Sequence, residues 1–502
     1  MNYGKGAIIF MRYISTRGGL EEKLSAEAIK QGLAADGGLF VPDTIPELSM
    51  TEIQELVNMD YATRAARILS KFLTDYTYEE LLQASQEAYS EQRFGNAAAP
   101  LYSLDEQNSV LELWHGPTCA FKDMALQIMP RLLSMALRKT GEARTALILV
   151  ATSGDTGKAA LEGYKDVDQV KIMVFYPQDG VSDMQKLQMA SQEGDNVNVC
   201  AIKGNFDDAQ TGVKRIFSDE AIAQELNQKG YFLSSANSIN WGRLAPQIVY
   251  YVSAYCDLLS AKKITAGQEI DVCVPTGNFG NIFAAYLAKK MGLPIRKLIC
   301  ASNRNNILTD FIRTGIYDRN RPFYTTMSPS MDILISSNLE RLLYLLQGPQ
   351  KTAECMKQLA QTGRYEVSEE IKKLIQQDFE AYFASEEDTA KTIHQVFNQQ
   401  KYLIDPHTAV ALFAAQQSKH EGRITVTAST ASPYKFSADV LAALGGKIDT
   451  EDFFQIQREL FRISSAPVPA PLSALENKTY RFTVSTGKSA EEMFQQVQAF
   501  IQ

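Results

Sequence analysis

From about residue 100 onward, short apolar runs alternate with segments in which apolar residues recur every three to four positions. The apolar runs predict strands at 145–151, 170–176, 197–202, 231–234, 271–275, 297–301 and 424–428. The other segments predict helices at 156–164, 183–192, 209–229, 241–260 and 282–291. Strands that alternate with helices form parallel sheets covered on both faces, and so many strands fit two sheets better than one. We therefore expect an α/β protein with two parallel or mixed-sheet lobes that carry helices on both faces.

The N-terminal part of the chain has a different pattern. Apolar residues recur at helical spacing within 26–31, 50–57, 62–72 and 78–91, and the run NAAAP at 96–100 ends this region. A chain of 502 residues also exceeds a single hydrophobic core. We expect a mostly helical N-terminal domain (1–100), a large α/β domain (101–140 and 230–502) and a small α/β domain (141–229). The segment SSAPVPAP at 465–472 is expected to be a linker or surface strap before a last strand and helix.

Composition excludes several classes of protein. Hydrophobic residues make up 45% of the chain and charged residues 22%, which is ordinary for a soluble globular protein. The net charge of −8 disfavours a general nucleic-acid binder, and no apolar run has the length of a membrane span. The six cysteines lack C-x-x-C spacing, so we expect no zinc or disulfide framework and a cytoplasmic location; with four histidines, no metal site is expected. Residues 1–10 lack a signal-peptide core, which makes Met11 a candidate start.

One lysine stands in an unusual setting. The apolar run 110–114 predicts a strand that breaks in the motif HGPTCAFKD (115–123), which places Lys122 between Phe121 and Asp123 just before a helical pattern. Burial at such a turn lowers the pKa of a lysine, and the neutral amine can form a Schiff base with a carbonyl such as that of pyridoxal phosphate (PLP). The alternative is an ordinary solvated lysine that begins a helix and pairs with Asp123.

Two glycine-containing loops each follow a predicted strand and open a helix. In PTGNFGN (275–281), Gly277 and Gly280 allow successive N–H groups to point inward, so this loop can hold a phosphate without lysine or arginine; the alternative is a tight turn that binds nothing. The loop ATSGDTGK (151–158) resembles a nucleotide-binding P-loop but has Thr152 in place of its first glycine. Its hydroxyls and N–H groups suit a carboxylate, or they simply cap the helix.

Two later clusters carry further polar groups. In SSANSINWGR (234–243), Arg243 at a helix start could bind a second anion together with Asn237 and Asn240, although capping by Asn240 is the alternative. In TASTAS (427–432), hydroxyls follow a late strand, and the alternative to a binding role is that they merely cap the next helix.

Together these motifs resemble the threonine synthase family over nearly the whole chain. They occur in the family's order, joined by YISTRGG, GLAADGGLFVP, TMSPSMDI, SSNLERLL and YLIDPHTAVA. The resemblance implies a tryptophan synthase β-like fold (PLP fold type II) with an added helical N-terminal domain, and the large domain as the PLP-binding one. It also implies threonine synthase activity, in which O-phospho-L-homoserine and water give L-threonine and phosphate by γ-elimination and β-addition. The implied partners are this small-molecule substrate and no nucleic acid or membrane, with the chain a monomer or homodimer.

The resemblance also implies roles for individual residues. Lys122 is the catalytic Schiff-base lysine, and the other cofactor-binding residues are Gly277, Asn278, Phe279, Gly280 and Asn281 around the PLP phosphate and Thr430 at the pyridine nitrogen. The implied substrate-binding residues are Ser153, Gly154, Asp155 and Thr156 at the carboxylate and Asn240 and Arg243 at the phosphate. The family usually reads T-A-H-P-A-K-F where this chain has Ser432 and Tyr434 for the histidine and the second alanine. Lys158 is expected only to flank the site.

Three alternatives stay open at this point. The first is another reaction on the same scaffold, such as serine or threonine dehydration. The second is a paralogue that binds PLP or a phosphorylated ligand for regulation, and the third and most distant is a P-loop ATP-binding protein.

Overall fold

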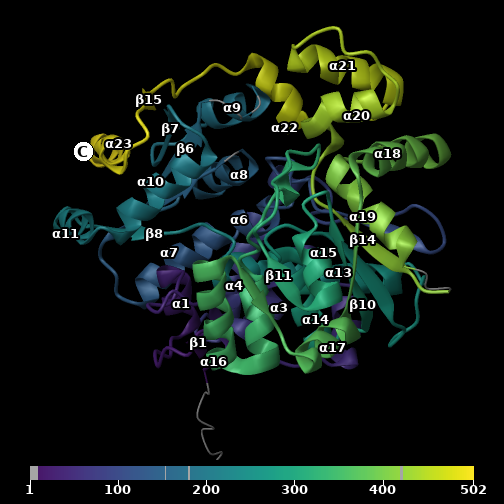
Figure 1. Ribbon diagram of the computed structural model, residues 1–502, viewed down its shortest axis with the longest axis horizontal. Helices are drawn as coiled ribbons and strands as arrows, with labels where there is room; N and C mark the ends of the chain where they lie inside the picture. The colour runs from purple at the N-terminus through teal and green to yellow at the C-terminus, as the bar shows by residue number, and fades with distance from the viewer. Residues whose placement is uncertain (1–9, 153, 179–180, 182, 419–421) are drawn as a thin grey trace, which may run out of the picture.

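The computed structural model describes residues 10–152, 154–178, 181, 183–418 and 422–502, and two sheets organise them (Figure 1). The larger sheet has the strand order β13-β10-β9-β14-β4-β3, with bounds β13 Phe379–Phe383, β10 Ile295–Ser302, β9 Ile270–Pro275, β14 Thr425–Ser429, β4 Asn108–Glu112 and β3 Leu101–Ser103. Every neighbouring pair is parallel except β3 and β4, which are antiparallel. The carboxyl ends of β9, β14 and β4 therefore lie at one edge, where loops can build a site.

The second sheet belongs to a smaller lobe. Its strand order is β15-β7-β6-β5-β8, with bounds β15 Ser485–Thr486, β7 Val197–Ile202, β6 Val170–Pro177, β5 Thr145–Ala151 and β8 Tyr231–Ser234. All of its neighbouring pairs are parallel. The prediction of two parallel or mixed-sheet lobes is confirmed.

The N-terminal region is largely helical, as predicted. It contains α1 Ser25–Gln31, α2 Met50–Leu56, α3 Tyr61–Phe72, α4 Tyr78–Ala88 and α5 Glu91–Phe94. A short antiparallel pair, β1 Tyr13–Ser15 with β2 Phe40–Pro42, was not predicted, because three-residue strands are too short to show an alternating pattern. Apolar side chains of this region share one hydrophobic core with the larger sheet.

Helices cover both faces of the two sheets. Their bounds are α6 Asp123–Leu126, α7 Met129–Lys139, α8 Asp155–Tyr164, α9 Asp183–Ala190, α10 Phe206–Ser218, α11 Glu220–Gln228, α12 Trp241–Leu244, α13 Pro246–Ser260, α14 Gly280–Met291, α15 Ile307–Thr314, α16 Leu339–Thr362, α17 Glu369–Asp378, α18 Glu386–Gln400, α19 Pro406–Gln417, α20 Ser437–Ala443, α21 Phe453–Ser464, α22 Ala470–Ser473 and α23 Ala490–Ile501. Short 3₁₀ turns η1 Pro329–Met331, η2 Pro433–Phe436 and η3 Ala474–Asn477, and the pair β11 Ile316–Asp318 with β12 Arg364–Glu366, complete the fold.

Two predicted helices are each divided in two. The segment 209–229 breaks at Asp219, whose ψ of 111° leaves the helical region and whose carboxylate accepts the N–H groups of Ala221 and Ile222 to begin α11. The segment 241–260 breaks before Pro246, which lacks the N–H that a continuous helix needs.

The C-terminal segment returns to the small lobe. The predicted last strand and helix are present as β15 and α23, and α23 lies beside α10 at the edge of this lobe (Figure 1). Because β8 and β15 both pair within the five-stranded sheet, we propose that the small domain extends from 141 to 234 and takes in 485–501. The rest of the predicted three-domain division stays a proposal. Part of the predicted linker, 465–472, forms the start of α22.

The small lobe contacts the larger one beside Lys122. Gly163 in α8 lies against the backbone of α6, where an added Cβ would stand 1.9 Å from the carbonyl oxygen of Leu126. Only glycine permits this approach, so the helix that follows Lys122 and the helix that follows the 152–156 loop pack directly on each other.

The described residues contain no helix that is both long and apolar enough to cross a membrane. Within the same residues, His, Cys, Asp and Glu side chains form no group that could hold a metal ion. All six cysteines are buried and free. Burial raises the pKa of Cys119 to about 12, which supports a packing role for this thiol beside Lys122.

Candidate active site

Lys122 stands at the turn between β4 and α6. The turn is fixed by Asp123, which is fully buried and accepts hydrogen bonds from the backbone N–H and the hydroxyl of Thr118, both at 2.8 Å. Burial raises the pKa of Asp123 to about 6. The carboxyl group of Asp123 is thus engaged by Thr118 in the turn itself. These contacts account for the position of Asp123 without the alternative in which it pairs with Lys122.

The backbone joins this turn to the loop after β14. The N–H of Phe121 donates to the carbonyl of Thr430 at 2.8 Å, and the N–H of Ser432 donates to the carbonyl of Cys119 at 3.0 Å. Lys122 and Thr430, which lie far apart in the sequence, are therefore neighbours at the carboxyl edge of the larger sheet. Thr430 is buried there.

The ammonium group of Lys122 has few contacts. Its Nζ is 3.8 Å from Oδ2 of Asp155, 3.4 Å from Oγ of Ser330 and 5.0 Å from the ring centre of Phe121. Burial lowers the pKa of Lys122 to about 8, against the opposing attraction of Asp155. A substantial fraction of this amine is consequently neutral and nucleophilic slightly above neutral pH.

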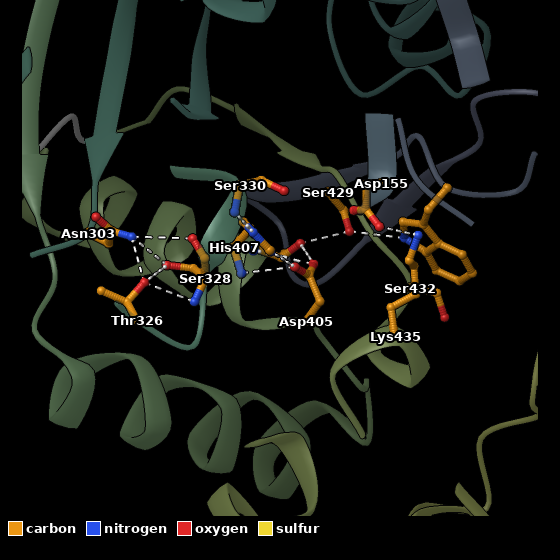
Figure 2. A network of polar contacts seen from close by, with 12 residues as sticks. Asp155, Asn303, Thr326, Ser328, Ser330, Asp405, His407, Ser429, Ser432 and Lys435 are labelled. Atoms are coloured by element: carbon orange, nitrogen blue, oxygen red, sulfur yellow. Dashed lines mark hydrogen bonds and ion pairs between the residues drawn. The ribbon is translucent and has the colours of Figure 1, made fainter. Parts of the chain in front are cut away.

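Asp155 joins the two lobes electrostatically. It begins α8 in the small lobe, and its Oδ1 is 2.6 Å from Nζ of Lys435 in the larger lobe (Figure 2). The side chain of Lys435 is fully buried and also donates to the carbonyl of Thr118 at 3.0 Å. Burial acts to raise the pKa of Asp155, but Lys435 and Lys122 outweigh it and hold that pKa well below its usual range.

The 152–156 loop is capped from within. The hydroxyl of Thr152 accepts the N–H groups of Gly154 at 3.0 Å and Gly157 at 3.1 Å, which supports the capping alternative for this hydroxyl. Gly154, with a φ of 149°, is the N-cap of α8, which begins at Asp155. Thr156 in the first turn of this helix is half-buried. Ser153 lies outside the described residues. Carboxylate binding by this loop stays a prediction.

The loop 277–281 follows β9 and opens α14. Its carbonyl groups are engaged on one side, where Ser336 Oγ donates to Gly277 at 2.7 Å and the N–H of Asn338 donates to Asn278 at 3.0 Å. Phe279 takes a left-handed φ of 63° at the helix N-cap. Gly277 packs so closely that a Cβ would lie 2.6 Å from the carbonyl oxygen of Ser330.

Several donors lie at the helix end of this loop. The N–H groups of the first turn of α14, at 280–282, precede the first backbone bond of the helix, which runs from Phe283 to the carbonyl of Phe279 at 3.0 Å. The Oδ1 of Asn281 accepts hydrogen bonds from Tyr250, at 2.8 Å, and from Tyr251, whereas its buried Nδ2 has no partner among the described residues. Unpaired buried donors at a helix N-terminus fit an anionic group such as the phosphate of PLP.

Arg243 in α12 is a second candidate position for an anion. Its guanidinium is buried and donates to the carbonyl of Ala236 at 2.9 Å, and no carboxylate among the described residues pairs with it. Burial lowers the pKa of Arg243 to about 10. The buried hydroxyl of Tyr164 also lacks a partner among the described residues and lies near enough to Arg243 to interact electrostatically. A buried cation without a counter-ion favours an anionic ligand.

Asn240 is occupied by the protein itself. Its Nδ2 donates to the carbonyls of Ile29 at 2.9 Å and Ser235 at 3.3 Å, and its Oδ1 accepts the N–H of Gly242 at 2.9 Å. The capping alternative accounts for these contacts, which fix the start of α12 and so the position of Arg243. A direct contact of Asn240 with substrate stays a prediction.

The residues that depart from the family pattern have local roles. Ser432 accepts the N–H of Tyr434 at 3.3 Å at the start of η2. The hydroxyl of Tyr434 donates to the carbonyl of Ala466 and so anchors the start of the 465–472 segment. Lys158 faces Glu162, at 3.5 Å, rather than Lys122. That Lys158 only flanks the site stays a prediction.

Several residues beside the site were not assigned a role from the sequence. Lys435, Ser330, His407 and Asp405 lie within motifs that carried the family resemblance, but no local pattern distinguishes them from helix caps or solvated side chains. Figure 2 shows Ser330, His407 and Asp405 in one connected network, with Asp155 and Lys435 beside it.

Comparison with known proteins agrees with this geometry. Residues 110–430 match the family model described as "Pyridoxal-phosphate dependent enzyme", an interval that runs from β4 to the loop after β14. The chain is thus a PLP-dependent enzyme of fold type II. Residues 12–89 match "Threonine synthase N terminus" and residues 408–501 match "Threonine synthase, C-terminal". The chain belongs to the threonine synthase family.

Three relatives show the extent of the similarity. The threonine synthase of Pseudomonas aeruginosa is 39% identical over 499 residues, which are 98% of each chain. Human threonine synthase-like 1 is 43% identical over 440 residues, but the match covers 84% of this chain and only 59% of that protein. The crystal structure of PLP-bound threonine synthase from Brucella melitensis has a TM-score of 0.88 and 36% identity, covering 98% of this chain and 100% of that one.

Proposed function

We propose that this protein is a threonine synthase that converts O-phospho-L-homoserine and water to L-threonine and phosphate. The observation that carries the proposal is a pair of separate anion positions in one protein that also carries a lysine with a lowered pKa. Among the described residues, the buried Nδ2 of Asn281 in the 277–281 loop has no partner, and the buried Arg243 has no carboxylate partner. One position suits the phosphate of PLP, and the other suits the phosphate of the substrate.

We assign the roles as follows. PLP, when bound, supplies the electron sink for proton removal next to the substrate nitrogen. Lys122 holds the cofactor through its Nζ and, once released, moves protons at the substrate carbons. Arg243 binds the phosphate of the substrate. The phosphate of the cofactor is bound by the donors of Gly277, Asn278, Phe279, Gly280 and Asn281. Thr430 lies at the pyridine nitrogen of the cofactor.

The start of α8 remains our proposed site for the substrate carboxylate. A second negative charge there is tolerable because Lys435 already neutralises Asp155 at 2.6 Å. Because the N–H of Gly154 already bonds to Thr152, binding then uses the N–H groups of Asp155 and Thr156 and the hydroxyls of Ser153 and Thr156.

The decisive experiment supplies purified, PLP-loaded protein with O-phospho-L-homoserine and measures threonine and inorganic phosphate together. Equal amounts of the two products are expected. The alternative dehydration reaction would instead give a keto acid from serine or threonine, with no phosphate released. A protein that binds PLP visibly and turns over neither substrate would favour a regulatory binding role.

Replacement of Arg243 by glutamine should weaken substrate binding strongly. Loss of one buried charged partner of a phosphate typically costs about 2–3 kcal/mol, so we expect KM for O-phosphohomoserine to rise ~30–150-fold. PLP absorbance should not change, because a different loop binds the cofactor phosphate. Steady-state kinetics and inhibition by inorganic phosphate measure the effect, and Arg243→Lys should lie between the two. An unchanged KM would remove Arg243 from the substrate site.

Location and assembly are proposals as well. Six buried free thiols are compatible with a reducing compartment, and we propose the cytoplasm. The choice between monomer and homodimer stays a prediction that sedimentation can test.

A further inference from the structure

The loop opposite Lys122 is held by a buried histidine. The 3₁₀ turn η1 carries Ser330, whose Oγ is 3.4 Å from Nζ of Lys122. The backbone N–H of the same serine donates to Nε2 of His407 at 3.2 Å (Figure 2). Nδ1 of His407 lies 2.8 Å from Oδ1 of Asp405. Ser330 therefore contacts the amine of Lys122 through its side chain and His407 through its backbone N–H.

The contacts of His407 define its state. A ring nitrogen that accepts an N–H must carry a lone pair, so Nε2 is unprotonated, and Nδ1 then carries the proton and donates it to Asp405. The histidine is 2% exposed and the aspartate 0%. The ring also packs edge-on against Phe436, with ring centres 4.9 Å apart. The acceptor nitrogen of the imidazole is thus aimed at Ser330.

Asp405 connects this histidine to the strand that leads to Thr430. It caps α19, and it accepts a hydrogen bond from the hydroxyl of Thr408. Because the one hydroxyl proton of Thr408 goes to Asp405, the hydroxyl of Ser429 donates to Oγ1 of Thr408 at 2.9 Å, and Trp114 donates to Oγ of Ser429 at 3.0 Å. The support for Ser330 is consequently built on the same rigid sheet edge that holds Lys122.

We propose that Ser330 is a hydrogen-bond partner of the reacting amine of Lys122, and that His407 is the positioning residue that holds Ser330 in place. The inference rests on the proposed role of Lys122. The 3.4 Å contact is long for a hydrogen bond, but catalytic contacts are often long in ligand-free proteins and shorten in the complex. The serine is exposed, whereas the histidine that accepts its N–H is buried.

The first test removes the hydroxyl of Ser330 and measures turnover with PLP-loaded protein and PLP uptake with ligand-free protein. We expect Ser330→Ala to lower kcat about tenfold with little change in KM, and to slow PLP uptake by the ligand-free protein. Ser330→Thr keeps a hydroxyl and should recover most of both rates. The matched control is Ser328→Ala, whose buried hydroxyl contacts Asn303 at 3.0 Å and Thr326 instead of Lys122; it should leave both rates unchanged.

The second test separates positioning from packing at His407. In His407→Gln the amide oxygen takes the place of Nε2 and can still accept the N–H of Ser330. In His407→Asn the amide reaches only the Nδ1 position and keeps the contact with Asp405. We expect the glutamine variant to be close to wild type and the asparagine variant to resemble Ser330→Ala. The double variant Ser330→Ala/His407→Asn should be no slower than either single one.

Specific results would overturn the proposal. These are wild-type kcat and PLP uptake in Ser330→Ala, multiplied losses in the double variant, or equal losses in His407→Gln and His407→Asn. PLP uptake, followed by absorbance, needs no substrate. It therefore still tests Ser330 and His407 if the chain makes no threonine, in which case the proposed function fails and this inference does not.

Discussion

Lys122→Ala is expected to abolish turnover and the visible absorbance of bound PLP. The side chain supplies both the attachment point for the cofactor and the proposed base, and positioned bases alone contribute about 10²–10⁴-fold to rate. We therefore expect kcat to fall at least ~10³-fold. Activity assays and absorbance spectra of the purified variant measure the two losses, and normal turnover in this variant would contradict the assignment.

Lys158→Ala is the matched control for that variant. Burial lowers the pKa of Lys158 as it does that of Lys122, but the Nζ of Lys158 contacts Glu162 and Gln192. If low pKa alone selected the reactive lysine, both variants would lose PLP. We expect only Lys122→Ala to do so. In the wild-type protein, PLP uptake should accelerate as pH rises through about 8, where the amine of Lys122 loses its proton.

The interior strands of the sheets could be predicted because they are buried on both faces. Strands β5 and β7 begin and end with the apolar runs 145–151 and 197–202, since interior parallel strands are nearly continuous apolar segments. Helix divisions were harder to predict. The breaks at Asp219 and Pro246 depend on single residues within otherwise helical patterns, and periodicity averages over them.

The residues of the candidate site also differ in how far they could be predicted from the sequence. Lys122 and the 277–281 loop lie in local motifs with their own chemistry, so their sequence neighbours could suggest a role. The partners of Ser330 and Asp155 lie far away in the chain, at His407 and Lys435, and only the fold brings them together. A lysine on a short 3₁₀ turn gives no local sign that it will be fully buried against a carboxylate from the other lobe.

Lys435→Met should destabilise the protein more than any other single change considered. Loss of one partner from a buried ion pair typically costs about 3–5 kcal/mol, because the other charge stays buried, and the side chains of Lys435 and Asp155 are 0% and 7% exposed. Lys122, at 3.8 Å, would then remain as a cation beside the carboxylate. We expect a lower urea midpoint for unfolding, together with weaker attachment of the small lobe, which carries Asp155.

The pH dependence identifies the cause of that loss. The folded-state pKa of Asp155 is held below its unfolded value of about 4, so the pair contributes stability above that pH and loses it as pH falls. The difference between wild type and Lys435→Met should therefore be largest near pH 7 and shrink below about pH 4. The double variant Lys435→Met/Asp155→Asn removes both charges and should regain most of the lost stability. A deficit that is the same at both pH values, and that Asp155→Asn does not relieve, would mean that the aliphatic stem of Lys435 stabilises this junction by packing and not by charge.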